Sequence, residues 1–105
     1  MNSILPSSER ISINATALYF YTVWMPISMN QYRSMEKLEK EFNVTISAVD
    51  CDAHTDLKKI YKITSVPTLI FLDAKSKEID RVEGYAMLSA FRAKFRDILK
   101  MNHEG

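Results

Sequence analysis

Hydrophobic and polar positions form blocks along the chain whose spacing predicts alternating strands and helices. The continuous β-branched and aromatic run "TALYFYTV" at 16–23 predicts a strand that is buried on both faces. From Met29 to Phe42 apolar residues recur every three or four positions, which is typical of an amphipathic helix. Because proline suits the first turn of a helix, Pro26 marks its start, and we expect this helix at 26–42.

The middle of the chain repeats this order of strand and helix. The run "VTISAVDC" at 44–51 predicts a second buried strand, and a short helix is expected at 54–61. Pro67 in "SVPTLIFLD" opens a third strand, since the first position of a strand tolerates the missing N–H of proline. These elements predict a βαβ unit that is followed by a further strand.

The C-terminal third predicts a last strand and a closing helix. After a polar turn at 75–77, the irregular spacing of apolar residues at 78–85 is typical of an edge strand with a bulge. The segment 88–99 has one apolar helical face, and a short strand near 3–5, followed by a helical turn, is expected before the first block. Together the elements predict an α/β fold, with a mixed four- to five-stranded sheet and helices on both faces.

Size and charge narrow the classes of function. With 105 residues, we expect a single domain that covers 1–105. Fourteen basic and thirteen acidic side chains leave a formal net charge of +1, which argues against nucleic acid as the main partner. No run has the ~20 predominantly apolar residues of a membrane-spanning helix. The N-terminus has no secretion-signal pattern, so we expect a soluble cytoplasmic protein with no membrane partner.

Cysteine and histidine offer little chemistry. Cys51 is the single cysteine, so the chain can form no internal disulfide. It lies between Asp50 and Asp52, whose charges should disfavour the thiolate, and we expect an inert structural role. Because His54 and His103 lack partners at ligand spacing, we expect no metal site, and no cofactor is indicated.

Four segments resemble the thioredoxin family, and the resemblance extends from Thr16 to Met101. They are "ALYFYTVW", where the family has the strand before its redox motif; "AVDCD"; "LKKIYKITSVPTLIFL", which is similar to the segment with the family's cis-proline; and "VEGY", which resembles a glycine turn beside the groove. The spacing Tyr-x-Ile-x-x-Val-Pro-Thr-Leu is the most specific of these features. The resemblance implies a thioredoxin fold with Pro67 in the cis form.

The residues after Trp24 depart from this family. Where the family has Cys-Gly-Pro-Cys, the chain has the degenerate motif Met25, Pro26, Ile27 and Ser28. Thiol–disulfide exchange needs a thiolate, which neither a thioether nor a serine hydroxyl without an adjacent base can replace. We therefore expect no catalytic residue at this motif, and a binding protein is favoured over an enzyme.

The family's proton-handling residues are missing as well. By the resemblance, its buried acidic residue corresponds to Tyr19 and the accompanying lysine to Ala48. The joint absence of thiols and proton carriers indicates an inherited loss of redox chemistry. The resemblance also implies that Cys51 lies at the end of a strand away from the Trp24 turn.

The same resemblance implies that three loops meet to form a binding groove for protein or extended peptide. The expected groove residues are Trp24, Met25, Ile27, Val66, Pro67, Gly84 and Tyr85. Exposed apolar patches mark contact sites, and methionine adapts to varied partners. The leading hypothesis is therefore a redox-inactive binding protein, acting as an adaptor or as a subunit of a complex.

Three alternatives stay open on the sequence alone. In the first, the apolar side chains simply pack over a site that has lost its chemistry. In the second, the protein is a thiol–disulfide oxidoreductase, either through Cys51 or because cysteines at positions 25 and 28 have been replaced in this chain. In the third, the Pro67 loop binds glutathione without turnover.

Overall fold

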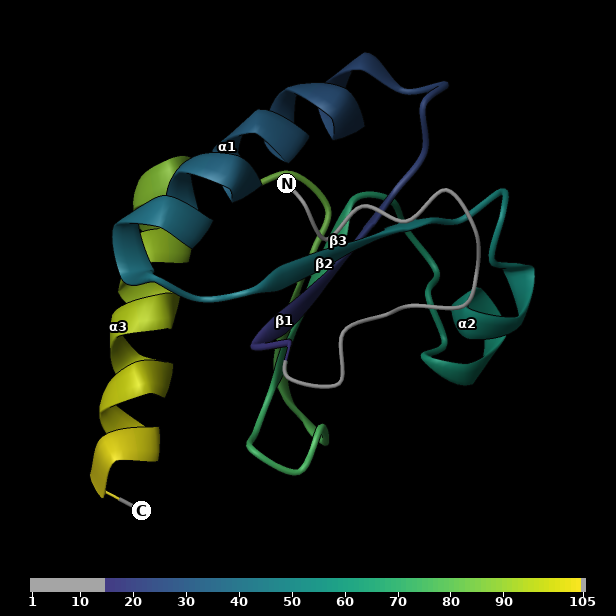
Figure 1. Cartoon of the computed structure of the whole chain (residues 1–105). Helices are drawn as coiled ribbons and strands as arrows, with labels where there is room; N and C mark the ends of the chain where they lie inside the picture. Colours follow the sequence, from purple (N-terminus) through teal and green to yellow (C-terminus); the bar gives the residue numbers. More distant parts are fainter. Residues whose placement is uncertain (1–14, 105) are drawn as a thin grey trace.

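The computed structural model describes residues 15–104, and the elements there follow the predicted order (Figure 1). They are β1 (Ala17–Tyr21), α1 (Pro26–Phe42), β2 (Ile46–Asp50), α2 (Thr55–Ile60), β3 (Thr68–Leu72), β4 (Glu78–Glu83) and α3 (Leu88–Glu104). Helix α1 has the predicted bounds, and the strands are somewhat shorter than predicted. The strand expected near 3–5 and the turn after it lie outside the described residues.

The described strands form one mixed sheet in the order β2-β1-β3-β4. Strands β1 and β2 are parallel, whereas β3 is antiparallel to both β1 and β4. Between β3 and β4 the register shifts: Phe71 pairs with Asp80, but Leu72 pairs with Glu78. Strand β4 therefore has one more residue than β3 at this point, which confirms the bulge predicted for the edge strand.

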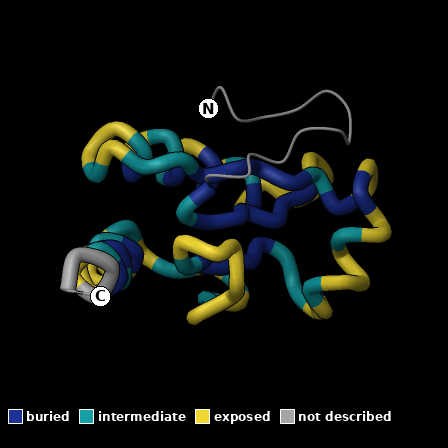
Figure 2. Tube along the Cα trace, turned by 60° about the horizontal axis from the view of Figure 1, so that its bottom comes forward, coloured by how far each residue is buried: buried dark blue, intermediate teal, exposed yellow. Residues whose placement is uncertain are grey.

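Helices cover both faces of the sheet, as predicted. Figure 1 shows α1 and α3 on one side of the strands and α2 on the other. Successive side chains of a strand point to opposite faces, so Tyr19 and Tyr21 pack in the cluster under α1 and α3, whereas Leu18 and Phe20 pack in the cluster on the α2 side. Figure 2 shows that the buried residues concentrate in the strands between these layers.

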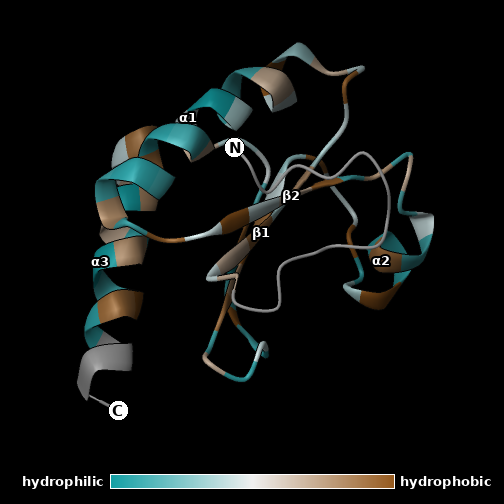
Figure 3. Ribbon diagram, in the orientation of Figure 1, coloured by the Kyte–Doolittle hydropathy of each residue, from teal (hydrophilic) through white to brown (hydrophobic). Residues whose placement is uncertain are grey.

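The two long helices form because their apolar residues recur at helical spacing. Helix α1 buries Tyr32, Met35 and Leu38, while the side of this helix visible in Figure 3 is mostly hydrophilic. It ends at Phe42, and the C-cap residue Asn43 has a φ of 52°, the left-handed conformation that is common after a helix. Phe95 of α3 meets Phe71 of β3 edge to face, with ring centroids 4.9 Å apart, so α3 is fixed on the same face as α1.

Candidate binding surface around Trp24

The turn between β1 and α1 is held by hydrogen bonds on both sides of Trp24. The Tyr19 hydroxyl donates to the Ser28 carbonyl over 2.6 Å, and the Thr22 N–H donates to Ser28 Oγ over 3.0 Å. Ser28 is fully buried. These bonds attach the end of β1 to the first turn of α1, so the backbone around Trp24 is fixed at both ends.

Ser28 lies near the start of α1 but does not cap this helix. Serine at a helix start is expected to accept free N–H groups of its own helix. The N-cap of α1 is instead Met25, without a side-chain hydrogen bond, and Ser28 lies inside the first turn. Its hydroxyl accepts the N–H of Thr22 from the preceding turn, because the side chain faces β1 and not the helix start.

The segment after β2 lies beside this turn. Thr22 Oγ1 donates to Asp52 Oδ2 over 2.8 Å, and the Cys51 N–H donates to the Tyr21 carbonyl over 2.9 Å. The expectation that Cys51 lies away from the Trp24 turn is therefore wrong for its backbone. Strands β1 and β2 are parallel, so their C-terminal ends share one edge of the sheet. The Cys51 side chain nevertheless packs in the cluster on the α2 side.

The proline loop reaches the same edge. The Val66–Pro67 peptide bond is cis. Phe20 of β1 pairs with Thr68 of β3, and the antiparallel register places Pro67 opposite the end of β1. The Pro67 side chain is buried, and Val66 is half-buried. Of the predicted groove residues, these two therefore expose little side-chain surface.

The loop between β4 and α3 completes the edge. The Gly84 N–H donates to the Pro67 carbonyl over 2.7 Å, and the Ala86 N–H donates to Gln31 Oε1 over 3.1 Å. Gln31 is buried in α1, one turn after Ile27. Gly84 has a φ of +82°, a conformation that favours glycine. The structure thus brings the Trp24 turn, the Pro67 loop and the Gly84 loop together.

Large apolar side chains project from these segments into solvent. Trp24 is 79% exposed and Tyr85 57%, while Met25 and Ile27 are 38% and 41% exposed. We call the exposed apolar set the Trp24 surface, which consists of Val23, Trp24, Met25, Ile27, Tyr85 and Met87. Val23 and Met87 were not among the predicted groove residues, although Val23 directly precedes Trp24 and Met87 follows Gly84 by three positions.

The two tyrosine hydroxyls buried behind this surface, those of Tyr19 and Tyr32, stay protonated at neutral pH. Tyr19 is fully buried, and burial raises the pKa of its hydroxyl, with the hydrogen bond to Ser28 opposing the shift. Burial likewise raises the pKa of Tyr32 to about 12. Ala48, at the position of the family's lysine, is buried in the same cluster as Tyr19. The phenol of Tyr19 therefore serves as a hydrogen-bond donor and not as a proton carrier.

Cys51 supplies no thiolate here. Its side chain is 4% exposed, and burial raises the pKa of the thiol to about 11. The charges of Asp50 and Asp52 raise it further, as expected from the sequence, while Lys58 lowers it. Burial is the largest cause, which the sequence analysis did not anticipate.

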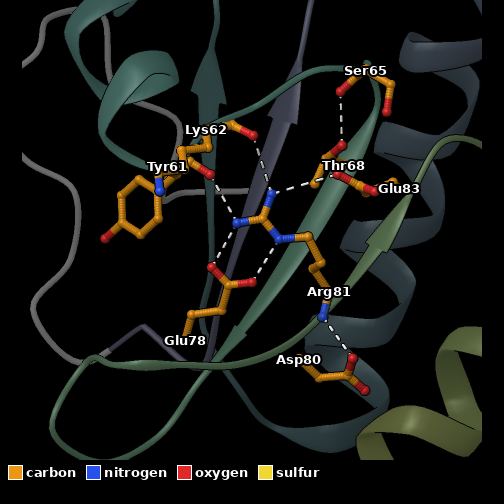
Figure 4. Close-up of polar contacts among 8 residues, drawn as sticks. All are labelled: Tyr61, Lys62, Ser65, Thr68, Glu78, Asp80, Arg81 and Glu83. Carbon is orange, nitrogen blue, oxygen red and sulfur yellow. Dashed lines mark hydrogen bonds and ion pairs between the residues drawn. The ribbon is translucent and has the colours of Figure 1, made fainter.

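An arginine that the sequence analysis missed holds the segment before the proline loop (Figure 4). Arg81 of β4 makes two bonds of 2.6 Å to Glu78, and its guanidinium also donates to the Tyr61 carbonyl over 2.8 Å and to the Lys62 carbonyl over 3.4 Å. Further along, Thr68 Oγ1 donates to the Ser65 carbonyl over 2.7 Å. Hydrogen bonds from Arg81 therefore attach the segment that precedes the Pro67 loop to strand β4.

Among residues 15–100, whose side chains the structure describes, no group of three or more histidine, cysteine, aspartate or glutamate side chains could hold a metal ion. His54 is buried at the start of α2, and the side chain of His103 lies outside the described part. None of the helices described is both long and apolar enough to cross a membrane.

Comparison with known proteins relates this fold to thioredoxin-like proteins. Residues 8–99 match the family model of a thioredoxin-like domain. Over 74 residues the chain is 32% identical to Glutaredoxin 3 of Danio rerio. The aligned stretch covers 70% of this chain but only 22% of the length of that protein.

Solved structures agree with the family match. Thioredoxin from Trypanosoma brucei brucei is 28% identical, with a TM-score of 0.73 and coverage of 84% of this chain and 80% of that one. The thioredoxin of Fasciola hepatica is 27% identical, with a TM-score of 0.73 and coverage of 81% and 84%. A mutant thioredoxin from Halobacterium salinarum shares the fold, with a TM-score of 0.77 over 90% and 89% of the chains at 18% identity. With a thioredoxin-like domain over most of its length and a single cysteine, this chain belongs to the thioredoxin family.

Proposed function

We propose that the chain is a redox-inactive member of the thioredoxin family that binds protein or extended peptide through the Trp24 surface. The observation that carries this proposal is the 79% exposure of Trp24, at the end of a turn where the family has its redox motif. Large aromatic side chains that are exposed in a cluster of apolar neighbours are typical of contact sites. The chain would act as an adaptor or as a subunit of a complex.

The rigidity of the turn supports binding. The hydroxyls of Tyr19, Thr22 and Ser28 all take part in hydrogen bonds that hold the backbone on either side of Trp24. A partner would therefore meet side chains on a backbone that is already ordered. Because less conformational entropy is lost on binding, such preorganisation strengthens a contact of given area.

The exposures argue against the alternative in which these side chains only pack over an inactive site. A side chain that fills such a site should be buried like Ser28 or Tyr19. Trp24 and Tyr85 instead keep more than half of their surface in water. Their apolar surface is hydrated unfavourably in the free chain, and a bound partner would remove this surface from water.

The rival proposal is a thiol–disulfide oxidoreductase that works through Cys51. Burial raises the pKa of the Cys51 thiol to about 11, so the thiol stays protonated at neutral pH and is a poor nucleophile for disulfide exchange. We expect no acceleration of insulin reduction by dithiothreitol, with an authentic thioredoxin as the positive control. Clear acceleration would overturn the binding proposal.

The direct test compares partner affinity in matched surface variants. Partners recovered with the wild-type chain would be purified and their affinities measured for Trp24→Ala, Ile27→Ala and Ile60→Ala chains. Ile60 is 68% exposed on α2, so it is a matched control for Ile27 away from the Trp24 turn. We expect Trp24→Ala to weaken binding by at least about tenfold and Ile60→Ala to leave it unchanged. Equal affinities for all four chains would refute the assignment of the surface.

A further inference from the structure

We propose that Met25 and Met87, two exposed residues of the Trp24 surface, are each a preferred site of oxidation by peroxide. Their exposed fractions are 38% and 67%. The other two methionines whose side chains the structure describes are protected: Met35 is fully buried, and Met29 is partly buried against the core. Since the susceptibility of sulfur to oxidation follows exposure, the two exposed thioethers should react first.

The only thiol does not compete with them. Peroxide attacks thiolate much faster than thiol, so an accessible thiolate would react before any methionine. Cys51 is 4% exposed, and its raised pKa keeps it protonated at neutral pH. The usual order of sulfur reactivity is therefore reversed in the part of the chain described.

The chemistry requires only the thioether and the peroxide. A lone pair of the methionine sulfur attacks one peroxide oxygen, an S–O bond forms and the O–O bond breaks. After proton transfer the second oxygen leaves as water, so the sulfur is oxidised by two electrons and the peroxide is reduced by two. The product sulfoxide replaces an apolar group on the Trp24 surface by a polar one.

The fold should tolerate this change. The Met25 backbone carbonyl accepts the N–H groups of Ser28 and Met29, over 3.0 and 3.2 Å, but its side chain makes no capping bond. Oxidation at Met25 would thus alter the surface while the start of α1 keeps its hydrogen bonds. A loss of partner affinity on oxidation rests on the proposed function, whereas the order of oxidation does not.

The first experiment measures that order. Folded protein would be treated with graded hydrogen peroxide, and sulfoxide at each methionine quantified by peptide mass spectrometry. We expect Met25 and Met87 to react at least about tenfold faster than Met35, with the rates converging in concentrated denaturant. Oxidation of Met35 or Cys51 as fast as Met25 and Met87 in the folded chain would overturn the proposal.

The second experiment measures the consequence. A partner recovered with the wild-type chain would be titrated before and after peroxide treatment, beside a variant with Met25→Leu and Met87→Leu, which roughly conserve volume. We expect treatment to weaken wild-type binding by at least about tenfold and to leave the variant's affinity unaltered. Equal losses in both chains would overturn the assigned consequence. If the untreated wild type captures no partner, the proposed function fails, and the mass-spectrometric order alone decides the oxidation site.

Discussion

Replacing Ser28 with alanine should destabilise the fold, because Ser28 connects β1 to α1. The substitution removes the acceptor of the Thr22 N–H and leaves a buried donor without a partner. Such an unsatisfied donor costs about 1–3 kcal/mol, whereas alanine improves helix propensity by about 0.5 kcal/mol. The net loss in unfolding free energy should therefore be about 0.5–2.5 kcal/mol.

The assay is urea unfolding followed by far-ultraviolet circular dichroism, which reports the loss of the helices, because Trp24 is already exposed in the folded chain. Ser34→Ala is the matched control, since Ser34 is a half-buried serine on the same helix and gains the same propensity. We expect the Ser28 variant to unfold at a lower urea midpoint than both the wild type and the control. Equal midpoints for the two variants would refute the structural role of the Ser28 hydroxyl.

Three further predictions concern the surroundings of this surface. Replacing Arg81 with methionine removes its hydrogen bonds to the Tyr61 and Lys62 carbonyls. The free energy of unfolding in urea should fall by about 1–2 kcal/mol, a figure already reduced because the arginine is partly exposed. An unchanged urea midpoint would count against its anchoring role. Because burial raises the Cys51 pKa from 9.0 to about 11, its contribution to stability is present below pH 9 and is lost as the pH rises through 11. The free energy of unfolding should therefore fall by about 2–3 kcal/mol between pH 9 and 11 in the wild type, and this loss should be absent from the Cys51→Ala variant. Equal losses in the wild type and the variant would contradict the prediction. Gly84→Ala should destabilise the fold by about 1–2 kcal/mol because of its φ of +82°, although no atom beyond the two neighbouring residues lies within 4 Å of the added carbon. A gain in melting temperature would argue against this strain.

Local patterns were sufficient to predict the elements. Pro26 and the apolar repeat that ends at Phe42 gave both bounds of α1, because they report conditions met within one helix. The continuous apolar run before Trp24 likewise predicted a strand with both faces buried, and β1 has helices on both sides.

Features that depend on distant pairing could not be predicted in the same way. Sequence spacing does not show that Ser28 faces β1, that Arg81 reaches the Tyr61 carbonyl, or that Asp52 accepts a bond from Thr22. Each of these contacts depends on which strands are neighbours and on their register. The exposure of a side chain such as Met87 is similarly a property of the assembled fold.

The substitutions behind Trp24 are consistent with one another in physical terms. A carboxylate at position 19, ionised at neutral pH, could not donate a hydrogen bond to the Ser28 carbonyl as the phenol of Tyr19 does. The Ser28 hydroxyl accepts the Thr22 N–H more strongly than a thiol would, since sulfur is a weak acceptor. Tyr19 and Ser28, at positions where the thioredoxin family handles protons and electrons, thus form hydrogen bonds that support the turn. Because that support lies directly behind exposed Trp24, the loss of redox chemistry that we propose and the fixed presentation of an apolar side chain would have a common structural origin.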